Sequence, residues 1–197
     1  MAKVKAKKPI TPHEAKKPEE PKKHTPLSPK EVHELFGIGG PYEPPPTPMS
    51  LVGYFTFWDC GMSIERIRER HRTLFYPTDF LDRAKFAKET DSWKWRQIRL
   101  APIEPGKPFA EQEKKLTNAD KPAAARELVT FLVLHFLMTG ERFEMDRWRC
   151  SDLLPSKKRV IVGPFSPLGL DIGTVSDEWE SPSIGLSAIF TPPPRRR

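Results

Sequence analysis

The chain has 197 residues with a formal net charge of +7 and 37% hydrophobic residues, which suits one ordinary domain with polar extensions. Its two cysteines, Cys60 and Cys150, are too few for a disulfide framework, and the lysine- and proline-rich start lacks the apolar segment of a secretory signal. This composition excludes a small disulfide-rich secreted protein and predicts a reduced, cytoplasmic setting.

Positive charge is concentrated at the two ends of the chain. The first fifty residues carry nine lysines against six glutamates, and three arginines end the chain, so each end contributes +3 of the total +7. Residues 51–194 therefore carry only +1. A basic nucleic-acid groove on the folded part would need a larger excess there, so the ends are the better candidates for contact with a polyanion.

Residues 1–48 are predicted to form a disordered arm rich in lysine and proline. Eleven of the 23 prolines lie in the first fifty residues, and large apolar side chains are few. Such a segment cannot bury enough apolar surface to offset the entropy of ordering it. One short helix is predicted inside the arm, because Ser28 and Glu31 have the spacing of a capping box ahead of Val32 and Phe36.

The folded domain is predicted to span residues 49–191 and to begin with a strand and a helix. Residues 51–58 are aromatic and β-prone, which predicts a strand. Ser63 can cap a helix that runs to about Phe75 with one apolar face. Large side chains then alternate over residues 93–100 and predict a second strand.

The longest apolar segment, residues 123–138, predicts a helix at about residues 121–139 that is buried nearly all round. Asp120 is the predicted N-cap, Pro122 suits the first turn, and Gly140 stands where a left-handed residue would end the helix. Two charged residues near its start leave the run short of the roughly 20 apolar residues that span a membrane. We therefore expect a core helix and no membrane association.

After this helix the pattern changes to short β-like runs separated by proline and glycine. These runs are residues 143–150, 159–162, 168–172 and 184–190. The order predicts a single small α+β domain with an antiparallel sheet packed on the central helix. Residues 192–197 are predicted to be a disordered basic tail.

Cysteine and histidine patterns give no catalytic or metal site. Cys60 precedes a predicted helix start, but His71 would lie about 16 Å further along that helix, too far to activate the thiol. Cys60, His71, His135 and Cys150 lack the paired spacing of metal ligands. We predict a buried inert cysteine, a hydrogen-bonded core His135, no metal and no cofactor.

Acidic residues after the central helix leave an enzymatic alternative open. Glu141, Glu144, Asp146 and Asp152 lie close together in the sequence, and a glycosidase or metal-dependent nuclease needs two acids at one spot. Asp146 and Asp152 would be the acids of a small hydrolase or nuclease, with Arg149 as an anion contact. The same pattern is typical of a solvated, ion-paired strand face.

Tryptophans interleaved with arginines form two candidate binding strands. Stacking of bases on exposed aromatic rings beside basic groups is a known mode of nucleic-acid binding, whereas tryptophan in a small domain also serves the core. The candidate binding residues are Trp93, Trp95, Arg96, Arg99, Arg147 and Arg149.

From Trp93 onward the chain resembles a group of uncharacterised bacterial proteins. The points of likeness are Trp93, Trp95, Arg96, Glu111-Gln112, Arg149-Cys150-Ser151, Val162-Gly163-Pro164-Phe165 and Gly169-Leu170. The resemblance implies a bacterial, cytoplasmic or mobile-element origin. It implies no catalytic or binding residue, because that group has no established activity.

These observations predict a non-enzymatic binding or adaptor protein that contacts a nucleic acid or another protein, with the basic tails as phosphate contacts. The alternatives are the small hydrolase or nuclease described above, and a structural or scaffold protein whose proline-rich arm is docked by a partner. The sequence does not distinguish these three.

Overall fold

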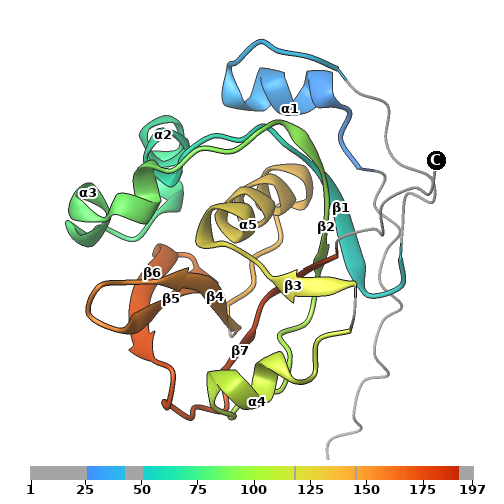
Figure 1. The fold of residues 1–197 in the computed structure, drawn as a ribbon. Helices are drawn as coiled ribbons and strands as arrows, with labels where there is room; N and C mark the ends of the chain where they lie inside the picture. The colour runs from blue at the N-terminus through green and yellow to red at the C-terminus, as the bar shows by residue number, and fades with distance from the viewer. Residues whose placement is uncertain (1–25, 43–50, 118, 145, 191–197) are drawn as a thin grey trace, which may run out of the picture.

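Two sheets and a central helix between them make up the body of the computed structural model, which describes residues 26–42, 51–117, 119–144 and 146–190 (Figure 1). Helices and mainly antiparallel strands occur together, which confirms the predicted α+β fold class. Among the described residues, no helix combines the length and the apolar character that crossing a membrane requires. Residues 26–42 are the described part of the predicted arm, and its other residues lie outside the described ranges. The predicted C-terminal tail, residues 192–197, lies outside them as well.

The first sheet joins strands that are far apart in the sequence. Its order is β1 (Tyr54–Asp59), β2 (Lys94–Arg99), β8 (Ala188–Phe190) and β3 (Asp120–Pro122), and all three pairs are antiparallel. The β1–β2 pair is the longest, and it brings the two ends of the strands together at Asp59 and Lys94. Aromatic and β-branched residues dominate β1, as a strand buried on both faces requires.

The second sheet is formed by the part of the chain that follows the central helix. Its order is β6 (Gly169–Ser176), β5 (Lys158–Ser166), β4 (Arg147–Leu153) and β7 (Ile184–Leu186). The β4–β7 pair is parallel, and the other two pairs are antiparallel. Ser187 alone separates β7 from β8, so one extended segment passes from the second sheet into the first.

The central helix α5 (Ala125–Thr139) packs on β1 of the first sheet and on β4 and β5 of the second. Every residue from Ala125 to His135 is buried, as its apolar sequence predicts. Phe131 lies at the middle of this contact, with its ring 5.2 Å from that of Phe55 and 5.7 Å from that of Phe143. The core is therefore organised around the helix, as the sequence indicates.

The helix begins later than its predicted start near residue 121. Residues 120–122 extend as β3 and pair with β8, so Asp120 is not the N-cap. Asp120 instead accepts a hydrogen bond from the Tyr54 hydroxyl at 2.8 Å. Ala124 is the N-cap residue, and its backbone N–H donates to the Glu127 carboxylate at 2.9 Å. Pairing with a distant strand thus outweighs a favourable local capping sequence.

A short helix, α1 (Pro29–Phe36), lies within the stretch predicted as an arm. The capping box of Ser28 and Glu31 is present, which confirms that local prediction. Val32 and Phe36 are fully buried in the main core. The packed body therefore reaches upstream of the boundary expected at residue 49.

Short helices between β1 and β2 build one corner of the molecule, beside α5 (Figure 1). We call residues 63–88 the helical corner. It contains α2 (Ile64–Arg70), the 3-10 turn η1 (Arg72–Leu74), α3 (Phe80–Arg83) and the 3-10 turn η2 (Lys85–Lys88). The single helix predicted to Phe75 ends at Arg70 and continues as the 3-10 turn.

Between the two sheets, α4 (Phe109–Glu113) packs near β7 at the end of the body away from α1 (Figure 1). The later β-like runs all overlap strands, but the run predicted at residues 143–150 becomes a strand only from Arg147, and the last run is divided between β7 and β8. The predicted single antiparallel sheet is in fact two sheets, one of which contains a parallel pair.

Candidate functional site

Five charged side chains meet where β1, β2 and α5 come together. Arg126 donates to the two carboxylate oxygens of Asp59 at 2.7 and 2.8 Å, and Arg96 Nε donates to the same group at 3.2 Å. Arg96 also lies 2.8 Å from Glu127 and donates to Asp91 at 2.5 Å. Asp59, Arg96, Arg126 and Glu127 are buried, and only Asp91 reaches the surface. We call this group the ionic cluster.

Neighbouring charges favour the ionised forms of Asp91 and Arg126 in the ionic cluster. Burial alone would raise the pKa of the Asp91 carboxyl, but hydrogen bonds from Lys94 and Ser92 and the charges of Lys94 and Arg96 keep that pKa well below its usual range. Burial opposes the charge of Arg126, yet the Asp59 carboxylate raises the Arg126 pKa. Three carboxylates and two guanidinium groups therefore coexist in a mostly buried site.

The three carboxylates of the ionic cluster resemble a cation site in spacing alone. Asp59, Asp91 and Glu127 offer oxygens within 4.8 Å of one another. The guanidinium groups of Arg96 and Arg126 already bind oxygens of these carboxylates. In this arrangement the ionic cluster joins β1 and β2 to the first turn of α5, and its geometry fits a structural role.

The predicted binding residues Trp93, Trp95, Arg96 and Arg99 lie just before β2 and within it. Arg96 is buried in the ionic cluster, as described above. Trp95 lies edge-on to the ring of Trp58 at 5.4 Å, and Trp93 lies edge-on to His33 at 4.7 Å. Trp93, Trp95 and Arg99 are each only half-buried. The tryptophans of this strand thus pack mainly against other aromatic rings.

The arginines of β4 differ from each other in exposure. Arg149 is fully buried and donates to the Gln112 side chain at 3.0 Å, to Lys107 O at 3.3 Å and to Trp179 O at 2.6 Å. Burial lowers the pKa of Arg149, since no carboxylate binds it directly. Arg149 therefore connects helix α4 with the loops that contain Lys107 and Trp179, whereas Arg147 remains half-exposed.

Asp146 and Asp152 lie apart from each other. They are six residues apart along an extended stretch, which corresponds to roughly 20 Å. Asp152 accepts a hydrogen bond from the Ala125 N–H at 2.6 Å, at the start of α5. Burial raises the pKa of the Asp146 carboxyl. This separation does not bring two acids to one reacting bond.

The two cysteines and His135 are buried. Burial raises the pKa of the Cys60 thiol to about 11, and it raises that of Cys150 as well, the opposite of what a nucleophilic cysteine needs. His135 lies among aromatic rings, 4.9 Å from Phe143 and 5.6 Å from Phe55. These positions resemble core packing more than catalysis.

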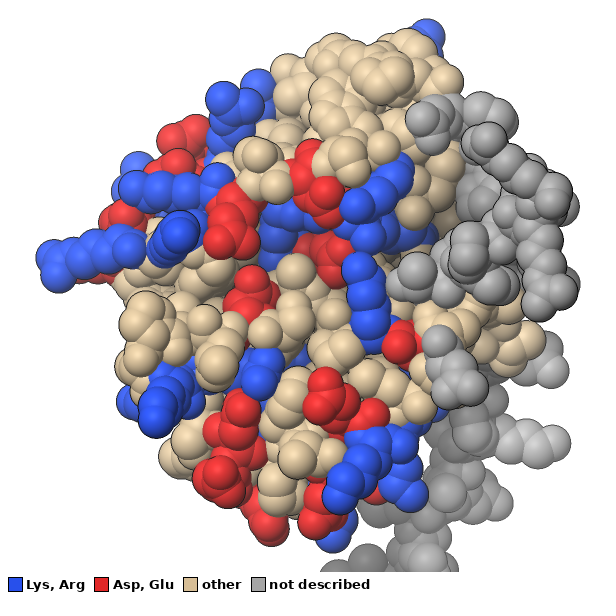
Figure 2. All heavy atoms as spheres, in the orientation of Figure 1, with Lys and Arg blue, Asp and Glu red and all other residues tan. Residues whose placement is uncertain are grey.

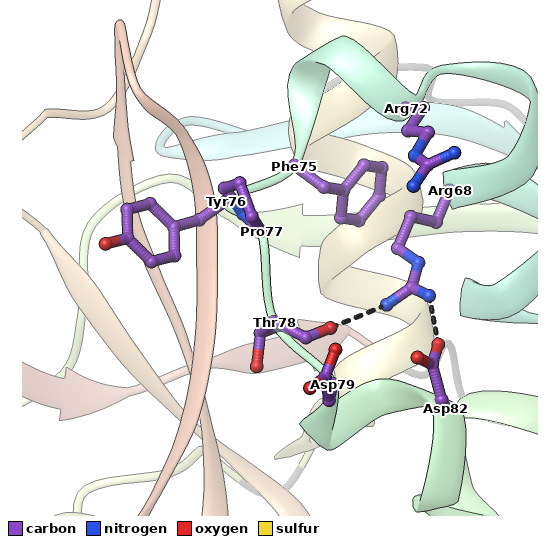
Figure 3. Close-up of a pocket in the computed structure, with 8 residues that line it drawn as sticks. All are labelled: Arg68, Arg72, Phe75, Tyr76, Pro77, Thr78, Asp79 and Asp82. Atoms are coloured by element: carbon purple, nitrogen blue, oxygen red, sulfur yellow. Dashed lines mark hydrogen bonds and ion pairs between the residues drawn. The ribbon is translucent and has the colours of Figure 1, made fainter.

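A pocket of about 220 Å³ opens on the helical corner. Its lining combines two arginines with apolar and acidic groups, and Figure 3 shows Arg68 and Arg72 on one side of Phe75 and Pro77, with the ring of Tyr76 pointing away from them on the other side. Arg68 donates to Thr78 O at 3.2 Å and pairs with Asp82. Tyr76 is 47% exposed, so its ring is accessible beside the pocket.

Charge is unevenly distributed over the folded body. The helical corner has seven basic and four acidic residues, net +3, whereas the rest of residues 51–190 has fourteen basic and sixteen acidic residues, net −2. Lysines and arginines project from the side on which α2 and α3 lie, as a comparison of Figures 1 and 2 shows. Its exposed basic residues are Arg66, Arg70, Arg72, Arg83, Lys85 and Lys88.

Comparison of the chain with protein-family models, with curated proteins and with solved structures finds no significant match.

Proposed function

We propose that the protein is a non-enzymatic binding or adaptor protein whose helical corner contacts the phosphates of a nucleic acid. The observation that carries the proposal is the separation of charge, +3 on the corner against −2 on the rest of the body. Phosphate contacts need accessible positive charge, and six basic residues of the corner are exposed.

The pocket on the corner favours a single strand over a duplex. Tyr76 and Arg72 both line the pocket, and the exposed ring of Tyr76 points outward from it on the side away from Arg72 (Figure 3). Unpaired bases can stack on such a ring while the neighbouring phosphates meet the arginine. The lysine-rich residues 1–25 carry a further net charge of +5, from eight lysines and three glutamates, and add nonspecific attraction.

Binding of a fluorescent single-stranded oligonucleotide to the full-length chain tests the proposal. Arg66, Arg72 and Lys85 are replaced together by glutamine, which removes three exposed charges from the corner. We expect a loss of affinity of at least about tenfold at low salt, since each phosphate contact adds to binding. A duplex of the same length should bind less tightly to the unmodified chain.

The matched control removes the same charge from another part of the surface. Lys114, Lys115 and Lys121 are exposed outside the corner and are replaced together by glutamine. We expect this variant to retain most of the affinity. Equal losses in the two triple variants would contradict a phosphate-binding corner, and so would the absence of binding by the unmodified chain.

A further inference from the structure

An exposed tryptophan lies between two glutamates on the loop that follows β6. Trp179 is 57% exposed, and its neighbours Glu178 and Glu180 are exposed as well. Tryptophan is the side chain that most often anchors a protein–protein contact, because it buries a large area at little cost in conformational entropy. The position therefore differs from that of Trp58 and Trp148, which are fully buried.

Buried arginines hold this loop in place from below. Arg149 donates to the carbonyl oxygen of Trp179 at 2.6 Å. Arg159 donates to both oxygens of the Asp177 carboxylate at 2.8 and 3.0 Å, and the Trp179 N–H donates to Ser176 O at 3.2 Å. Because the backbone is already fixed, a ligand that covers the indole ring does not have to order the loop.

Both acidic and basic side chains lie on the segments around the exposed ring. The loop lies beside α4, since Phe109 N donates to Asp177 O at 2.9 Å, and α4 carries the exposed Glu111. Acidic and basic side chains alternate along the edge of the body that contains α4, the lower edge in Figure 2. Exposed lysines lie nearby as well, since Lys107 and Lys114 flank α4 and Lys158 pairs with Ser176 at the end of β6, whereas Arg149 and Arg159 are buried beneath the loop. The negative charge next to Trp179 therefore comes from its two sequence neighbours, Glu178 and Glu180.

We propose that Trp179, Glu178 and Glu180 form a docking site for the lysine-rich residues 1–25 of the same chain. A lysine ammonium group is attracted both to the face of an indole ring and to the flanking carboxylates. Residues 1–25 carry eight lysines, and a stretch of 25 residues spans up to about 80 Å when extended, which is enough to reach across a domain of this size.

The covalent link makes this occupant more effective than a separate basic peptide. A tethered segment has an effective concentration in the millimolar range, so contacts that are weak between separate molecules become populated within one chain. Docking and the nonspecific attraction of residues 1–25 for a nucleic acid compete for the same lysines. The docking inference does not depend on nucleic-acid binding, and its test uses no nucleic acid.

A nitroxide label on the arm tests the proposal in the full-length chain. Ala6→Cys supplies the attachment point, and Cys60 and Cys150 are buried and stay unlabelled. NMR spectra record the indole N–H signals of the five tryptophans with the label oxidised and then reduced. We expect the Trp179 signal to lose most of its intensity with the oxidised label, and high salt to restore it.

Variants separate local docking from general attraction. Glu178→Gln combined with Glu180→Gln should restore the Trp179 signal, whereas Glu141→Gln combined with Glu144→Gln, an equal change of exposed charge elsewhere, should not. An unaffected Trp179 signal, or equal broadening of all five indoles, would overturn the proposal. A mixed sample can contain one chain with the nitroxide label and another, isotope-labelled chain whose Trp179 signal is observed. Broadening of the Trp179 signal in that sample would also overturn the proposal, since the contact would then be with a second molecule.

Discussion

Replacement of Arg126 by methionine tests whether the ionic cluster stabilises the fold. The substitution removes donors at 2.7 and 2.8 Å from Asp59 and one at 3.3 Å from Asp91. Asp59, which has no exposed surface, keeps the Arg96 Nε and Gly61 N–H donors. Loss of one partner of a buried ion pair costs about 3–5 kcal/mol, a large part of the roughly 5–15 kcal/mol that stabilises a typical domain. Urea unfolding, followed by tryptophan fluorescence, measures this loss from the transition midpoint and slope.

Two further variants make the prediction for Arg126 specific. Arg66→Met changes an exposed arginine of α2 and should alter the unfolding free energy by no more than about 0.5 kcal/mol. Asp59→Asn added to Arg126→Met removes the stranded charge, so the double variant should lose less than the sum of the two single losses. Equal stability of Arg126→Met and Arg66→Met would refute the reasoning, and strict additivity would show that the two groups act separately.

Three other predictions follow from buried groups. His33 Nε2 accepts a hydrogen bond from the Trp58 indole N–H at 3.1 Å, and burial lowers the His33 pKa, so the native state binds fewer protons than the unfolded state. The free energy of unfolding should therefore be highest above about pH 6.5 and should fall as the pH drops below that value. Unfolding experiments at several pH values should show a weaker fall for His33→Gln. Arg149→Lys cannot reach the same three acceptors and should cost at least about 2 kcal/mol in thermal unfolding; a loss no larger than that of Arg66→Met would show that these bonds contribute little. Cys60 and Cys150 should react with a thiol reagent only after unfolding, and fast labelling of the native chain would contradict their burial.

Local patterns in the sequence predict the elements better than their assembly. The all-apolar face of α5 and the capping box of Ser28 each depend on neighbouring residues, and both occur in the structure. Strand β3 was missed because its Asp-Lys-Pro sequence has no β-propensity and pairs only through the distant β8. Likewise, no local signal indicates that the segment from Ile184 to Phe190 divides between two sheets.

The candidate sites show the same dependence on long-range contacts. Asp59, Asp91 and Glu127 of the ionic cluster are more than thirty residues apart from one another in the sequence, so no motif with a fixed spacing predicts that they meet. A signal was available, since Arg126 and Glu127 stand in a helix that is otherwise apolar and buried, and buried charges require partners. The net charge of the helical corner can also be counted from the sequence of residues 63–88. A single count over the whole body gives only +1, which hides the local excess.

The salt dependence of oligonucleotide binding tests the central claim most directly. The slope of log affinity against log salt concentration counts the phosphates that the protein neutralises, at about 0.7 per contact for a single strand. The account predicts that replacing Arg66, Arg72 and Lys85 by glutamine lowers this slope by about 2, while the Lys114, Lys115 and Lys121 variant keeps the original slope. The same slope in all three proteins would contradict the claim that the helical corner binds phosphates.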